Sequence, residues 1–279
     1  MTYQDWGGLI FNSTSFADGL AGSEQCKRDI HFLQQLGINT ILVLSVITRD
    51  HAYCMRLLEN AGIYVILILN GLNEDAQVVD GATVLPWDYT TYSRFFARID
   101  AFHKFSNTLA FAFELTDISE EDSTWTPKIK AAARDMKEYI ANRKYRAIPV
   151  GSFEYDHMTT SFADYMRCGN SSDSVDFHGV KTIWTLNKTS ETQGPLQAEQ
   201  TFRSRDPRCL NASIAEDRLV GQFKDYPIPT IILNGCEAKY NHTFDEVSTI
   251  YRNLSNTFSG VIVEDYINKK RYDRGKYAK

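Results

Sequence analysis

The chain has 279 residues, of which 43% are hydrophobic and 23% are charged, a balance that is typical of globular proteins and excludes wholesale disorder. Its 30 Lys and Arg residues against 35 Asp and Glu give a net charge of −5, which argues against a nucleic-acid-binding protein because such domains are basic. No apolar run approaches the roughly 18 residues that a membrane span requires. A chain of this length can form a single domain, and we expect one globular domain over residues 1–279.

Apolar runs rich in β-branched residues alternate along the chain with amphipathic stretches of helical spacing. The runs are continuously apolar, as in strands that are buried on both faces of a parallel sheet. Gly37 and Gly62 predict helix ends, and Pro127 predicts a helix start. In chain order, the predicted elements are helix Glu24–Leu36, strand Thr40–Val46, helix Asp50–Asn60, strand Tyr64–Leu69, helix Asp88–Phe105, strand Thr108–Leu115, helix Lys128–Arg143, strand Ala147–Phe153, helix Thr159–Met166, strand Phe177–Trp184, helix Ile214–Phe223, strand Thr230–Leu233, helix Phe244–Leu254 and strand Gly260–Val263.

Seven strands that are each coupled to a helix predict an α/β fold, a (β/α)8 TIM barrel with one strand unaccounted for. Residues 2–4 have the character of the tail of that strand, so we expect the first strand to be largely truncated at the N-terminus. The alternative is an open doubly wound sheet, but no Gly-x-Gly-x-x-Gly follows the first strand, which disfavours dinucleotide binding. Met1 is followed directly by polar residues 2–5, so we expect no signal peptide on this chain.

Cysteines and glycosylation sequons bear on the compartment. None of the five cysteines forms the C-x-x-C spacing of a zinc or redox site, and we expect neither a metal nor a cofactor. Six Asn-x-Ser/Thr sequons favour a secreted glycoprotein, in which most of the cysteines would pair and one would be left over. The alternative is a cytosolic enzyme with inert buried thiols. The sequons are at Asn12, Asn170, Asn187, Asn211, Asn241 and Asn253.

The chemistry of a barrel lies at the C-terminal ends of its strands, and Glu114 is the most suggestive residue there. It ends the apolar run 109–114, where an apolar rim would favour the protonated carboxyl that a general acid needs. The alternative is a rim carboxylate held by a loop amide or an arginine. A retaining glycosidase would need a second carboxylate about 5 Å away. The other strand-end candidates are Ser45, Asn70, Phe153, Trp184, Asn234 and Glu264.

Ordered sequence blocks between about Tyr3 and Tyr266 carry a family resemblance. The blocks are Cys26–Ile30, Leu36–Ile41, Ala61–Val65, Lys130–Lys137, Tyr145–Gly151, Ala163–Tyr165 with Cys168-Gly169, and Asp176–Gly179. Together they resemble the fungal β-1,3-glucanosyltransferases, glycoside hydrolase family 72. The resemblance implies a secreted, glycosylated (β/α)8 barrel, usually lipid-anchored, that cuts a β-1,3-glucan and rejoins it to another chain.

The active-site blocks depart from the family pattern. Glu114 matches the acid/base of the family's Gly-Asn-Glu-Val motif, but Phe113 stands where the family has the Asn that holds the sugar 2-hydroxyl. The family nucleophile lies in Ser-Glu-Tyr-Gly-Cys, and the corresponding stretch here is one residue shorter. The alignment places either Leu233 or Asn234 at the nucleophile, and neither can form a glycosyl ester. Glu237 is the nearest carboxylate, and the interpretation favoured for it is a solvated loop residue.

Sugar-binding and cysteine positions of the family are also only partly retained. Leu42–Leu44 replaces the family's Arg-Val-Tyr, and Lys181–Leu186 replaces its Asn-Met-Tyr-Glu-Trp-Cys, so two cleft tyrosines are lost. The resemblance implies a Cys26–Cys54 disulfide and leaves Cys209 as a substitute partner of Cys236, with Cys168 unpaired. The candidate carbohydrate-groove residues are Gln4, Phe113, Trp184, Glu237 and Glu264.

We therefore expect a secreted or cell-wall glycoside-hydrolase-like pseudoenzyme. Its expected partner is β-1,3-glucan or another cell-wall oligosaccharide, or a protein on which it acts as an effector. In the protein-partner case, Leu44, Phe113, Trp184 and Leu233 would close the groove. The alternative is a residual β-1,3-glucan hydrolase or glucanosyltransferase that uses Glu114 as acid/base with a base such as Glu237 or Glu264.

Overall fold

The computed structural model describes residues 2–3, 18, 20–21, 23–44, 46, 50–70, 77–79, 82–84, 88–114, 125–155, 160–182, 184–185, 210–211, 219–234 and 245–263. Eight parallel strands form one sheet, in the order β1-β2-β3-β6-β7-β8-β11-β12. They are β1 (Thr2–Tyr3), β2 (Thr40–Val43), β3 (Tyr64–Ile68), β6 (Thr108–Glu114), β7 (Val150–Tyr155), β8 (His178–Thr182), β11 (Thr230–Asn234) and β12 (Gly260–Val263).

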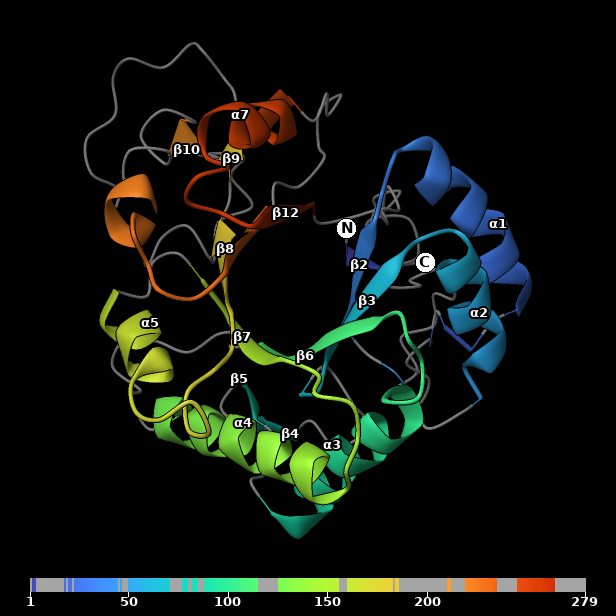
Figure 1. The fold of residues 1–279 in the computed structure, drawn as a ribbon, viewed down its shortest axis with the longest axis horizontal. Helices are drawn as coiled ribbons and strands as arrows, with labels where there is room; N and C mark the ends of the chain where they lie inside the picture. Colours follow the sequence, from blue (N-terminus) through green and yellow to red (C-terminus); the bar gives the residue numbers. More distant parts are fainter. Residues whose placement is uncertain are drawn as a thin grey trace, which may run out of the picture.

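The sheet curls into a nearly closed barrel with the helices outside it (Figure 1). The last strand, β12, comes into contact with β2, and the short β1 pairs with β2 in parallel. The predicted (β/α)8 barrel is confirmed, including the tail of a first strand at residues 2–3. The helices are α1 (Ser23–Gln35), α2 (Ala52–Asn60), α3 (Tyr89–Phe102), α4 (Trp125–Asn142), α5 (Thr160–Arg167) and α7 (Asp245–Asn253), with a further helical stretch at residues 219–223.

Helix ends follow the glycine and capping signals of the sequence. Gly37 and Gly62 lie at φ +69° and +72°, the left-handed region that glycine enters without a steric penalty. Gly37 N–H donates to Gln34 O and Ile38 N–H to Leu33 O, both at 3.0 Å, which satisfies carbonyls at the end of α1. At the start of α3, the Asp88 carboxylate accepts from Thr91 N–H at 2.9 Å, an N-terminal cap that fixes where the helix begins.

Several strand limits differ from the sequence prediction, and two short strands were not predicted. β7 begins at Val150 rather than Ala147, because Pro149 has no N–H for the ladder; its carbonyl still accepts from Phe111 N–H. The predicted strand Phe177–Trp184 is divided: β8 ends at Thr182, and β9 (Trp184–Thr185) pairs with β10 (Leu210–Asn211) in a separate sheet. The antiparallel pair β4 (Gln77–Val79) and β5 (Ala82–Val84) was not predicted, because three-residue strands give little periodicity.

The barrel interior is filled by apolar side chains. Two aromatic rings lie over glycines: a Cβ added at Gly151 would meet Phe177 at 2.4 Å, and one added at Gly179 would meet Phe153 at 2.0 Å. The two rings contact each other edge to face, with centroids 6.0 Å apart. The interior cluster therefore depends on residues without side chains beneath the rings. It contains Leu42, Ile66, Ile68, Ala110, Ala112, Phe153, Phe177, Leu233 and Ile262.

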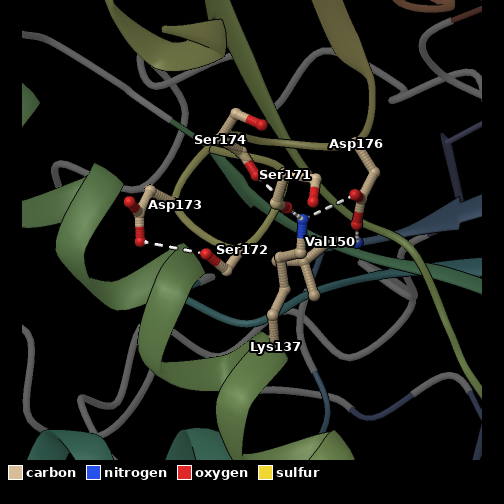
Figure 2. Close-up of polar contacts among 7 residues, drawn as sticks. All are labelled: Lys137, Val150, Ser171, Ser172, Asp173, Ser174 and Asp176. Carbon is tan, nitrogen blue, oxygen red and sulfur yellow. Dashed lines mark hydrogen bonds and ion pairs between the residues drawn. The ribbon is translucent and has the colours of Figure 1, made fainter. Parts of the chain in front are cut away.

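A lysine joins α4 to the N-terminal ends of β7 and β8 (Figure 2). Lys137 Nζ donates to the carbonyls of Ser171 and Ser174 and lies 2.6 Å from Asp176 Oδ1. The second oxygen of Asp176 accepts from Val150 N–H at 2.8 Å. One lysine thus holds the loop before β8 and, through Asp176, the first residue of β7. This clamp lies at the opposite end of the strands from the candidate chemistry.

The predicted disulfide between Cys26 of α1 and Cys54 of α2 is confirmed, with the two Cα atoms 5.7 Å apart. Cys168 is exposed and forms no disulfide with another described cysteine; Cys209 and Cys236 lie outside the described residues. Among the helices described here, none is both long and apolar enough to cross a bilayer.

Candidate functional site

Glu114 is the last residue of β6 and faces the barrel interior. Ala110 and Ala112, which share its strand face, belong to the interior cluster, because alternate residues of a strand point to the same side. The Glu114 carboxylate lies 3.7 Å from Nζ of Lys181 on β8, and the two side chains are only 12% and 13% exposed. The C-terminal end of the barrel therefore holds a largely buried carboxylate–ammonium pair.

The backbone of Glu114 is fixed by an amide from the neighbouring strand. Asn70 follows β3; its Nδ2 donates to Glu114 O at 2.7 Å, and its Oδ1 accepts from Glu114 N–H at 2.8 Å. The carbonyl of the preceding residue, Leu69, accepts from the buried guanidinium of Arg98 on α3. Burial lowers the pKa of Arg98 to about 10, so the group stays charged at neutral pH. Arg98 and Asn70 together position Glu114.

The strand that carries the family nucleophile ends differently here. Leu233 of β11 is fully buried in the interior cluster, and it lies directly opposite Lys181 in the β8–β11 register. Asn234 ends β11, and its side chain lies outside the described part. Leu233 is therefore the residue of this strand end that occupies the interior, beside the lysine that pairs with Glu114.

Two features of this arrangement bear on glycosidase chemistry. A retaining mechanism needs a second carboxylate about 5 Å from the first, whereas among the described residues the neighbouring interior positions hold the alkyl group of Leu233 and the ammonium of Lys181. An ammonium 3.7 Å away favours the ionised form of Glu114, whereas a general acid must carry a proton. The carboxylate of Glu114 is thus paired with a lysine, in place of the arginine or loop amide of the structural alternative, whereas the Asn70 amide holds only its backbone.

One predicted groove residue is placed elsewhere by the structure. Phe113 is fully buried on the outer face of β6 and packs edge to face against Phe95 of α3, with ring centroids 5.3 Å apart. Its ring belongs to the core between the sheet and α3, so assigning it to the groove was wrong. The cause is strand alternation: Glu114 faces the interior, and its neighbour faces the opposite way.

The other groove candidates are only partly described. Trp184 has its backbone in β9, and its side chain lies outside the described part, as do Gln4, Glu237 and Glu264 altogether. Leu44, expected with Phe113, Trp184 and Leu233 to fill the barrel mouth, packs partly buried against the interior cluster. Of those four residues, Leu44 and Leu233 face the interior, and Phe113 does not.

Sequence reasoning missed the lysine of the site. Lys181 appeared only as a replacement within a family block, although a lysine inside an apolar strand run, at the same face as Gly179, was a signal for an interior charge. The role of Arg98 had no local signal, because its acceptor lies 29 residues away. Among the described residues, no group of three His, Cys, Asp or Glu side chains could hold a metal ion.

Two sequon asparagines lie in the described part with their side chains. Asn170 follows α5 in the loop that Lys137 holds, and Asn253 ends α7; both are exposed, as a glycosylation site requires. Asn211 is described only as a backbone position in β10, and Asn12, Asn187 and Asn241 lie outside the described residues.

Comparison with known proteins identifies relatives over nearly the whole chain. A family model described as glucanosyltransferase, glycoside hydrolase family 72, matches residues 1–275. The 1,3-beta-glucanosyltransferase GAS5 of Saccharomyces cerevisiae is 32% identical over 265 residues, which cover 92% of this chain and 50% of that protein. The 1,3-beta-glucanosyltransferase PGA4 of Candida albicans is 33% identical, covering 91% of this chain and 53% of its own length.

A solved structure agrees in fold. Saccharomyces cerevisiae Gas2p in complex with laminaritriose and laminaritetraose is 30% identical and superposes with a TM-score of 0.73, covering 94% of this chain and 55% of that one. The chain thus spans about half the length of the relatives that it matches.

Proposed function

Because the chain belongs to the glucanosyltransferase family, glycoside hydrolase family 72, we propose that it is a non-catalytic member that binds β-1,3-glucan at the C-terminal end of its barrel without cutting it. The observation that carries this proposal is the interior triplet Glu114, Lys181 and Leu233. Lys181 pairs with Glu114 and stands opposite a fully buried leucine, where a retaining enzyme would need a carboxylate.

Two observations support a carbohydrate ligand. The chain shares its fold with a protein solved with laminaritriose and laminaritetraose. Glu114 and Lys181 supply an acceptor and a donor at the end of the barrel where ligands of this fold bind, and each is slightly exposed. A secreted or cell-wall location is part of the proposal, since the Cys26–Cys54 disulfide is typical of oxidising compartments, and Asn170 and Asn253 are accessible sequons.

The competing proposal is a residual glucan hydrolase or glucanosyltransferase with Glu114 as acid/base, favoured by relatives that are named as glucanosyltransferases. It requires a second carboxylate from residues outside the described part, such as Glu237 or Glu264. An inverting enzyme would need that carboxylate roughly 6.5–9.5 Å from Glu114, and would also have to free Glu114 from Lys181 at the moment of reaction.

Calorimetric titration with laminaripentaose tests the proposed binding. We expect saturable binding with a Kd on the order of 0.1–1 mM, and full recovery of the pentaose afterwards. Glu114→Gln should weaken binding about tenfold, because a charged acceptor gives a stronger hydrogen bond than an amide. A β-1,4-linked cellopentaose serves as the control ligand and should give no binding heat.

The matched control variant is Lys137→Met, at the opposite end of the strands. Its affinity for laminaripentaose should equal that of the unaltered protein at a temperature at which both are folded. An absence of heat with laminaripentaose, or equal heats with both pentaoses, would contradict glucan recognition and leave the protein-partner role in its place.

A further inference from the structure

A second buried polar group lies on the outer face of β7 and β8, away from the barrel mouth. Ser152, Glu154 and His178 are each at most 2% exposed. His178 Nε2 lies 2.7 Å from Glu154 Oε1, and its Nδ1 lies 3.4 Å from Ser152 Oγ. The three side chains alternate with interior residues such as Phe153 and Gly179, and so point outward toward the helices.

Aromatic rings cover this group. The His178 ring stacks on Phe223 with centroids 5.8 Å apart, and has Phe162 of α5 and Tyr226 at 6.4 and 6.3 Å. No substrate can therefore reach Ser152, and the serine–histidine–carboxylate sequence is not a hydrolytic site. The second oxygen of Glu154 has no hydrogen-bond partner among the described residues.

Within the described part of the chain, few titratable groups lie around Glu154 and His178. On α5, Asp164 and Arg167 pair with each other at 2.9 Å and are partly exposed. Burial raises the pKa of Tyr226, whose ring lies beneath Arg167. At the strand starts, the Lys137–Asp176 pair is self-neutralising. On β11, the buried outward residues Thr230 and Ile232 carry no charge.

We propose that Glu154 and His178 share one proton that the folded barrel keeps, and that this proton bridge gives the fold a stability optimum at mildly acidic pH. With two protons the pair would be a buried cation, and with none it would be a buried anion; either charge is costly in an apolar surrounding. With one proton the pair is neutral overall, whichever of the two residues holds it. The burial of both side chains therefore selects the one-proton form.

The pH window follows from proton counting. In the unfolded chain the two groups titrate near 4.5 and 6.5, so between these values it also holds one proton and stability does not change with pH. Below about 4.5 the unfolded chain gains a second proton, and stability falls as pH falls. Above about 6.5 it loses its proton, and stability falls as pH rises. In each of these two pH ranges, which we call the acid and the alkaline arm, the folding equilibrium constant changes by up to tenfold per pH unit.

The directions of the two pKa values agree with a neutral pair. Burial raises the pKa of Glu154 and lowers the pKa of His178 to about 3. Taken separately, the raised pKa of Glu154 lowers the free energy of unfolding as pH rises above 4.5, and the lowered pKa of His178 lowers it as pH falls below 6.5. Between pH 4.5 and 6.5 the two slopes are equal and opposite, so the free energy of unfolding does not change with pH.

Two single variants separate the arms. In Glu154→Gln, neutral His178 remains buried, so stability should fall below about pH 6.5 and be level above it. In His178→Gln, the protonated Glu154 remains buried, so stability should fall above about pH 4.5 and be level below it. The measurement is the urea midpoint from pH 3.5 to 8.5 at fixed ionic strength. The buried Asp18–His51 pair is present in the wild type and in both variants. Its contribution therefore cancels when the stability of a variant is subtracted from that of the wild type at each pH.

Parallel pH profiles of the wild type and both variants would overturn the proposal. Should a variant fail to fold, the histidine ring signals of the wild type decide it by NMR. His178 should show no titration between pH 4.5 and 8. A His178 midpoint near 6.5 would contradict a retained proton.

Discussion

Gly179→Ala is expected to lower the free energy of unfolding by about 3 kcal/mol, the upper part of the range for an overpacked core. The added methyl would stand 2.0 Å from Phe153 Cδ1, far inside van der Waals contact. The ring cannot retreat easily, because Phe177 lies against it. The backbone of β8 is equally constrained, since it pairs with β7 on one side and β11 on the other.

Gly221→Ala is the matched control for this substitution. Gly221 lies in the helical stretch at residues 219–223, and a Cβ there meets nothing within 4 Å. An alanine should leave stability unchanged or raise it by about 0.5–1 kcal/mol through helix propensity. Chemical denaturation of both variants measures the difference. A loss below about 1 kcal/mol for Gly179→Ala would mean that Phe153 does not fill the barrel interior.

Lys181→Met is expected to cost about 3 kcal/mol at neutral pH. It removes the ammonium that pairs with Glu114 in a largely buried place, and the loss of one member of such a pair leaves a poorly solvated charge.

A double-mutant cycle isolates the pair. Glu114→Gln combined with Lys181→Met should be more stable than Lys181→Met alone, with a coupling between the two positions of about 1.5–3 kcal/mol. Urea denaturation of the wild type, the two single variants and the double variant at pH 7 gives this coupling. Additive effects would show that Lys181 does not hold Glu114 ionised.

The architecture could be predicted because its signals are local. Apolar runs, helix spacing and the glycines at positions 37 and 62 each act over a few residues, and together they give the barrel order that the sheet shows. The Cys26–Cys54 disulfide was implied by family resemblance. The strand limits were predicted less accurately: β7 begins only after Pro149, and β8 ends at Thr182.

The side-chain directions at the site could not be predicted. Leu233 and Asn234 were alternatives in the sequence, because the alignment with the family could be shifted by one residue, and such a shift exchanges the two faces of a strand. The β8–β11 register and the interior cluster place Leu233 inside. The same alternation removed Phe113 from the groove. The Glu114–Lys181 and Glu154–His178 contacts each join two strands, and no short-range pattern reports them.

Incubation with laminarihexaose followed by mass spectrometry of the products tests the central claim most directly. Under the proposed function, the protein should leave the hexaose at its original length, and wild type and Glu114→Gln should give the same spectrum, because a retaining cycle needs a second carboxylate beside Glu114. Shorter and longer oligosaccharides that appear with the wild type and vanish with Glu114→Gln would contradict the account and establish an active transferase.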